Sequence, residues 1–100
     1  MAIYTGTKSA SGDSAAIIDP GATKKVHLRG DQQLQSEATG ALTILLKVGT
    51  TTVRRVYCAN AGDGVLFEID YVGAAGETVI VNLSAAVAMG YVLNATLEGA

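Results

Sequence analysis

The sequence predicts an all-β domain, an antiparallel β-sandwich of roughly six to eight strands with Greek-key or jelly-roll-like connections. Three observations predict it. Apolar and polar residues alternate with a period of two through most of residues 41–99. Gly, Asn or Asp bounds each alternating run, and the runs recur at short, regular spacing. This combination is typical of sandwiches rather than of helical domains.

Residues 1–22 are expected to form an extended N-terminal arm, and residues 23–100 the sandwich domain. The arm is rich in Ser, Thr, Gly and Ala, and such a composition buries too little apolar surface to order on its own. Asp19-Pro20-Gly21 predicts a turn at the entry to the domain, because Pro presets φ and Gly accepts a positive φ. The single proline therefore stands outside the strands, as a hydrogen-bonded ladder requires.

The strands follow in chain order from the phase of their apolar residues. Residues 23–29 place Val26 and Leu28 on one face, and residues 30–33 are expected to form a polar turn. Residues 34–39 fit either a short edge strand or a loop. The remaining expected strands all alternate between glycine-containing turns: residues 42–48, 52–58, 65–72, 78–83 and 91–97.

The connections between these strands are expected to be short. Residues 62–64 and 73–76 predict hairpin turns rather than phosphate-binding loops, because neither segment opens a helix after a buried parallel strand. Residues 84–90 form the only helix-compatible stretch, which fits either one or two helical turns or an irregular crossover.

Composition excludes several classes of function. The net charge of −2 offers no basic stripe for nucleic acid, and no apolar run is long enough to cross a membrane. The N-terminus shows no secretion signal, which predicts synthesis in the cytosol. Only 16% of residues are charged and 49% are hydrophobic, which indicates that part of the surface is covered by copies of the chain or by a partner.

Few residues can carry chemistry. His27 is the only side chain that titrates near neutral pH, and with Lys25 and Arg29 on its own face it is expected to be an exposed sheet histidine in a cationic setting. Cys58 is expected to be a buried or interfacial thiol rather than a reactive thiolate, and a single cysteine excludes an internal disulfide or a cysteine-based zinc site. Glu68 and Asp70 share one strand face, where paired carboxylates suit glycoside cleavage or calcium but also an ordinary polar face. We therefore expect no enzyme, no catalytic residues, no metal and no cofactor.

In composition and in the order of its segments, the chain resembles small accessory virion proteins of tailed bacteriophages. These include capsid decoration (cement) proteins and small head or tail β-proteins. The features that carry this resemblance are the arm 1–22, the turn at residues 19–21, and the closing segment 90–99 after a cysteine-poor sandwich rich in Thr, Val and Ala. The resemblance implies a homo-oligomer, for example a trimer, that binds a viral capsid or tail protein within the virion. It implies no particular functional residues, because the class shares no residue motif.

The expected function is therefore that of a structural protein that binds a repetitive assembly. Apolar residues in the arm predict the interface, through burial and strand addition: Ile3, Tyr4, Ile17 and Ile18. The alternative is a ligand- or carbohydrate-binding module, which needs an aromatic or polar platform on an exposed face. Tyr57, Tyr71 and Tyr91 are expected to point inward, which argues against an aromatic platform.

Overall fold

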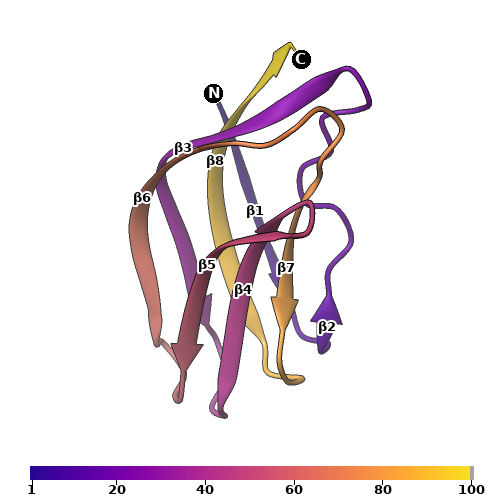
Figure 1. The fold of residues 1–100 in the computed structure, drawn as a ribbon. Helices are drawn as coiled ribbons and strands as arrows, with labels where there is room; N and C mark the ends of the chain where they lie inside the picture. The colour runs from indigo at the N-terminus through magenta and orange to yellow at the C-terminus, as the bar shows by residue number, and fades with distance from the viewer. Residues whose placement is uncertain (100) are drawn as a thin grey trace.

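The computed structural model describes residues 1–99, which form eight β-strands in two antiparallel sheets of four strands packed face to face (Figure 1). The predicted all-β sandwich is confirmed. Ala100, the last residue of the expected domain, lies outside the described residues. Residues 1–99 contain no helix that is long and apolar enough to span a membrane.

The eight strands occupy most of the chain: β1 (Ala2–Lys8), β2 (Gly12–Asp13), β3 (Lys24–Ser36), β4 (Leu42–Val48), β5 (Thr51–Cys58), β6 (Gly64–Val72), β7 (Val79–Leu83) and β8 (Met89–Gly99). One sheet has the order β1-β8-β3-β6, and the other has the order β2-β7-β4-β5. We call these the β8 sheet and the β4 sheet.

The strand pairing is that of a jelly roll. The first strand pairs with the last, and the remaining strands pair in the same way toward the middle of the chain. The pairs are β1 with β8, β2 with β7, β3 with β6, and β4 with β5. The chain is thus one long antiparallel hairpin wound around a single core, the arrangement of the eight-stranded jelly roll. The jelly-roll-like connectivity expected from the sequence is confirmed.

The core lies between the sheets and follows the predicted alternation. In β4 the residues Leu42, Ile44, Leu46 and Val48 are all fully buried, while the residues between them face outward. Full burial of one such side chain contributes roughly 1.5–3 kcal/mol of transfer free energy.

The structure corrects the expected division at residue 22. Strand β1 pairs with β8 along its full length, and β2 pairs with β7 in the opposite sheet. Ile18 forms an isolated bridge with Val79 and is only 1% exposed. Residues 2–18 therefore complete one edge of each sheet instead of extending from the domain. Their order comes from pairing with strands far along the chain, which a local composition does not reveal.

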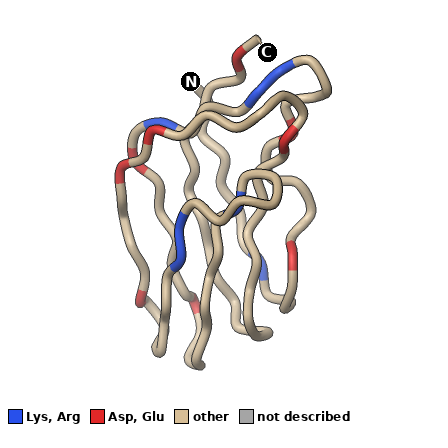
Figure 2. The backbone as a smooth tube through the Cα atoms, in the orientation of Figure 1, with Lys and Arg blue, Asp and Glu red and all other residues tan. Residues whose placement is uncertain are grey.

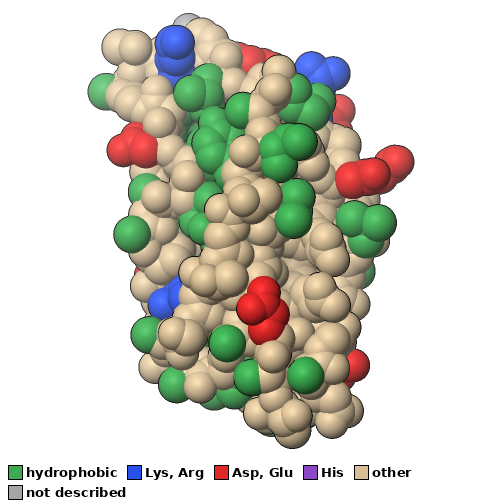
Figure 3. Space-filling view, turned by 180° about the vertical axis from the view of Figure 1, so that it is seen from behind, with side chains coloured by type: hydrophobic (Ala, Val, Ile, Leu, Met, Phe, Trp, Pro, Cys, Tyr) green, Lys and Arg blue, Asp and Glu red, His purple; other side chains and the backbone are tan. Residues whose placement is uncertain are grey.

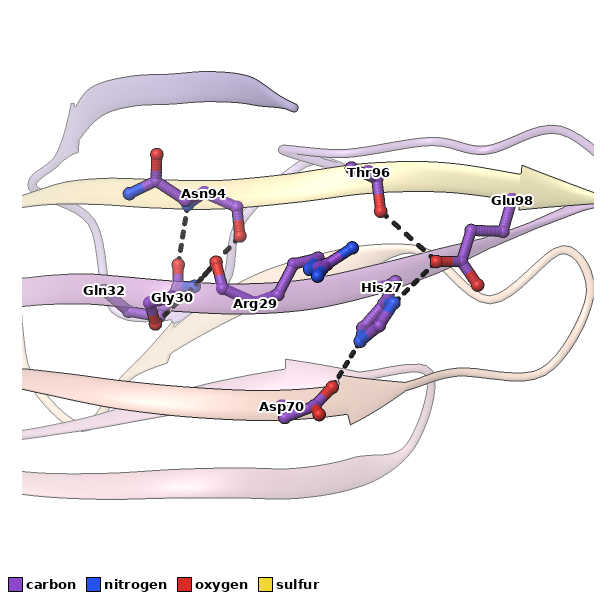
Figure 4. A network of polar contacts seen from close by, with 8 residues as sticks. All are labelled: His27, Arg29, Gly30, Gln32, Asp70, Asn94, Thr96 and Glu98. Carbon is purple, nitrogen blue, oxygen red and sulfur yellow. Dashed lines mark hydrogen bonds and ion pairs between the residues drawn. The ribbon is translucent and has the colours of Figure 1, made fainter.

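Strand β3 is also longer than expected, because the polar turn at residues 30–33 is a bulge within a continuous strand. The register of β3 against β8 shifts after Leu28, and Gly30 adopts a φ of 78°, which favours glycine. At this bulge the buried Gln32 side chain takes the place of the missing backbone hydrogen bonds between β3 and β8 (Figure 4). Its amide donates to the Asn94 carbonyl at 2.9 Å, and its amide oxygen accepts from the Asn94 N–H at 2.7 Å.

Two expected hairpins are instead crossings between the sheets. Strand β6 lies in the β8 sheet, whereas its neighbours in sequence, β5 and β7, lie in the β4 sheet. The glycine turns at residues 62–64 and 73–76 therefore carry the chain from one layer to the other. A turn signal fixes a reversal of direction but does not say which sheet the next strand joins. Residues 84–88 connect β7 to β8 without a helix.

Candidate functional site

His27 lies between two carboxylates on the outer face of the β8 sheet (Figure 4). Its Nδ1 is 2.6 Å from Oε2 of Glu98 on β8, and its Nε2 contacts the carboxylate of Asp70 on β6. Because His27 belongs to β3, the strand between those two, this cluster joins three adjacent strands. The side chain of His27 is 14% exposed, so the predicted exposed histidine in a cationic setting is wrong. Neighbours across the sheet, not those along the strand, determine its charge environment.

The two carboxylates favour the charged form of the imidazole. Hydrogen bonds to Asp70 and then Glu98 raise the pKa of His27 above its ordinary value of 6.5, and desolvation opposes them only in part. The same hydrogen bonds to His27 lower the pKa of Asp70 and of Glu98. Both ring nitrogens are occupied by carboxylates, which leaves neither free to take a proton from a bound molecule. The cluster therefore acts as a structural link between strands.

We predict that this link makes stability depend on pH in a defined window. A raised histidine pKa contributes stability that is fully present below 6.5 and is lost as pH rises through the folded-state value. The lowered carboxylate pKa values contribute stability that is present above about 4.5 and is lost as pH falls. The difference in urea midpoint between the wild type and His27→Gln should be largest near pH 5.5 and shrink toward pH 9. A difference that stays constant across this range would contradict the assignment.

The other candidate residues hold structural positions. Cys58 is buried, its Sγ donates to the Asp63 carbonyl at 3.4 Å, and burial raises the pKa of its thiol. Glu68 and Asp70 are both exposed on β6, but only Asp70 is held by a partner in the described chain. Within residues 1–99, no group of three or more His, Cys, Asp or Glu residues is arranged to hold a metal ion.

Only one of the four predicted interface residues reaches solvent freely. Ile3 is 67% exposed on the outer side of β1. Tyr4 and Ile17 are half-buried and pack against the core, and Ile18 belongs to the core itself. An interface that uses Ile18 is therefore wrong for the folded chain, because its side chain lies inside the sandwich, whereas the roles of Ile3, Tyr4 and Ile17 stay predictions.

The tyrosines divide between the two sides of the sheets. Tyr71 and Tyr91 pack against the core as expected. Tyr57 is 67% exposed, which corrects the expectation that it points inward. Its neighbours Val56 and Cys58 are buried, and alternation along a strand leaves only the outer side for the residue between them.

Three of the four edge strands carry devices that discourage pairing with another chain. Strand β2 has only two residues. Strand β5 presents exposed Arg54 and Arg55 and shifts register against β4. Strand β6 presents the exposed carboxylates of Glu68 and Asp70. The guanidinium of Arg54 also lies 4.7 Å from the centre of the Phe67 ring, across the gap between these two edges.

Strand β1 has only one such device, a lysine at its last position. Its seven residues pair with β8 without a register shift, and within residues 1–99 no strand pairs with its other side. Its only charge is Lys8, at its last position, and it contains no proline. Ile3 stands exposed near its start. A regular edge whose only charge stands at its last position is a template for an added strand.

Charged residues lie at both ends of the molecule (Figure 2). The end that carries both termini includes Lys24, Lys25 and Glu98, and the connections at the other end include Glu37, between β3 and β4, and Asp63, between β5 and β6. No protein-family model, no curated protein and no solved structure matches this chain.

Proposed function

We propose that this chain is a non-enzymatic structural protein that pairs with a second copy through β1 and binds a repetitive protein assembly. The role that fits best is that of a minor virion protein, such as a capsid decoration protein of a tailed bacteriophage. The observation that carries the proposal is that β1 is the least protected edge, with a single charge at its last position, in a sandwich whose other edges are short or carry two charges.

Strand β1 is suited to pairing with its own copy. Antiparallel pairing centred on Thr5 sets Lys8 opposite Ala2 of the other copy, so that no like charges meet. It sets Ile3 opposite Thr7, which shields an exposed apolar side chain from water. Two-fold contacts of this type are the commonest in homo-oligomers. The trimer implied by the resemblance stays a prediction, and the β1 edge favours a pair.

A pair of copies explains the low surface charge and suits a repeating target. Each copy presents the same outer surfaces, so two weak contacts with adjacent subunits of an assembly combine into strong binding. Jelly rolls occur in viral capsid domains and in lectins alike, and the fold alone does not choose between these functions. The least protected edge, β1, and the scarcity of charge favour assembly.

We predict that Ile3→Asp weakens self-association by at least about tenfold without unfolding the chain, because a charge at an exposed edge position blocks strand addition. Sedimentation equilibrium over a range of protein concentrations measures the change. The matched control is Leu66→Asp on β6, because Leu66 is equally exposed, at 67%, on the far edge of the same sheet. Equal effects of the two substitutions would argue against β1 as the contact.

A further inference from the structure

A shallow groove of about 340 Å³ crosses the outer face of the β8 sheet, the face seen in Figure 3. It lies over β8, between β1 and β3. Two cross-strand rows line it: Thr5, Val92 and Gln33 form one row, and Thr7, Gly90 and Gln35 form the other. Hydroxyl groups therefore stand on one side of the groove and amide groups on the other.

The absence of a side chain at Gly90 makes room for the Glu37 carboxylate beside the groove. The backbone φ of Gly90 is not in the left-handed region, so backbone conformation does not demand glycine there. A Cβ added at this position would collide with the carboxylate of Glu37, which lies over the strand at this point. Gly90 thus lets the Glu37 carboxylate lie close to the strand, where it places an acceptor in the lining of the groove.

Several polar side chains around the groove make no hydrogen bond within the described part of the fold. In the described part of the chain, the hydroxyls of Thr5 and Thr7 and the carboxylate of Glu37 make no side-chain hydrogen bond or ion pair. Gln33 donates only a long contact of 3.4 Å to Gln35, whereas the Gln35 amide donates to the Gly62 carbonyl at 3.1 Å. On the same face, the donors and acceptors of His27 are fully engaged. The hydroxyls of Thr5 and Thr7, the Glu37 carboxylate and most of the Gln33 amide are therefore available to a bound molecule in this groove.

The chemistry of this lining points to a neutral ligand rich in hydroxyl groups. No Lys or Arg lines the groove, which disfavours phosphate and other anions, and a single carboxylate is a poor site for a metal ion. Amide, hydroxyl and carboxylate groups together donate to and accept from hydroxyl pairs. The volume lies near the lower end of small-molecule sites, about 300–1,000 Å³.

We propose that this groove binds a neutral saccharide, of mono- or disaccharide size, in a site organised around Gly90 and Glu37. The groove shares Thr5 and Thr7 with the β1 strand that the proposed pairing uses, but Ile3 does not line it. The Ile3→Asp variant should therefore bind saccharide as the wild type does.

The test is a titration of ¹⁵N-labelled protein with a panel of neutral hexose and pentose mono- and disaccharides, followed by amide chemical shifts. We expect saturable shifts at Gln33, Gln35 and Gly90 with at least one sugar. Gly90→Ala displaces Glu37, whose carboxylate is the flexible end of its side chain, and should weaken binding at least about tenfold. Gly99→Ala, on the same strand but with open space around the added methyl group, is the matched control and should bind normally.

Three outcomes would overturn the site. These are no saturable shift with any sugar of the panel, equal affinity of Gly90→Ala and the wild type, or shifts confined to the opposite face around Tyr57. Glu37→Gln supplies a second variant that keeps the shape of the groove and removes the charge. It should weaken binding even if Gly90→Ala disturbs the fold, and unchanged binding by Glu37→Gln would contradict the role of the carboxylate.

Discussion

Replacing Ile18 with aspartate is expected to lower the free energy of unfolding by at least about 4 kcal/mol and to leave the chain largely unfolded in mild urea. Ile18 is 1% exposed and bridges to Val79, so an aspartate there would place an unpaired carboxylate in the core. Domains of this size are stable by only about 5–15 kcal/mol, and such a loss is a large part of the total. Urea unfolding followed by circular dichroism measures the effect.

The neighbouring residue supplies the control for this prediction. Ile17→Asp changes the same residue type at a half-buried position and should cost clearly less than Ile18→Asp. Ile18→Val should cost only about 1 kcal/mol, since it removes a single methylene. If Ile18→Asp were as stable as Ile17→Asp, residues 2–18 would not be part of the sandwich.

Replacing Gln32 with leucine is expected to cost about 2–4 kcal/mol, although leucine is close to glutamine in size and more apolar. The Gln32 amide pairs with both the N–H and the carbonyl of Asn94, and it reaches the Gly30 carbonyl at 3.4 Å. Leucine would leave these backbone groups without a partner at a fully buried position. Thermal or urea unfolding measures the loss.

Gln33→Leu is the matched control, because Gln33 is the next residue and faces outward. It should change stability by less than about 0.5–1 kcal/mol. A Gln32→Leu variant as stable as this control would show that the bulge in β3 does not depend on the side-chain amide of Gln32.

The sheet-forming parts of the fold could be predicted because they depend on a local pattern. Strand β4 alternates without interruption, and its four inward residues are all buried. Strand β3 carried a usable signal as well, since Val26, Leu28 and Leu34 share one phase of alternation across the expected turn. Gln32 hid this alternation, because its position in the sequence is polar and resembles a turn. In the structure its side-chain amide is buried and hydrogen-bonds to the backbone of Asn94 in place of a strand neighbour.

The surroundings of individual residues and the identity of the edge strands could not be predicted, because they depend on which strands lie side by side. The environment of His27 is set by Asp70 and Glu98, which are far from it in sequence. Ile18 is buried by a bridge to Val79. The free edge of β1 becomes visible only when the strand order is known, since an edge is a property of the whole sheet.

The central claim, that β1 pairs with a second copy, is tested most directly by amide hydrogen exchange of Ala2–Lys8 as a function of protein concentration. In a single copy, the β1 N–H groups that point away from β8 have no strand to pair with and should exchange rapidly. The account predicts that these amides become protected as concentration rises, together with a doubling of the native mass. Rapid exchange of these amides at every concentration would contradict it, and so would association that protects β5 or β6 instead.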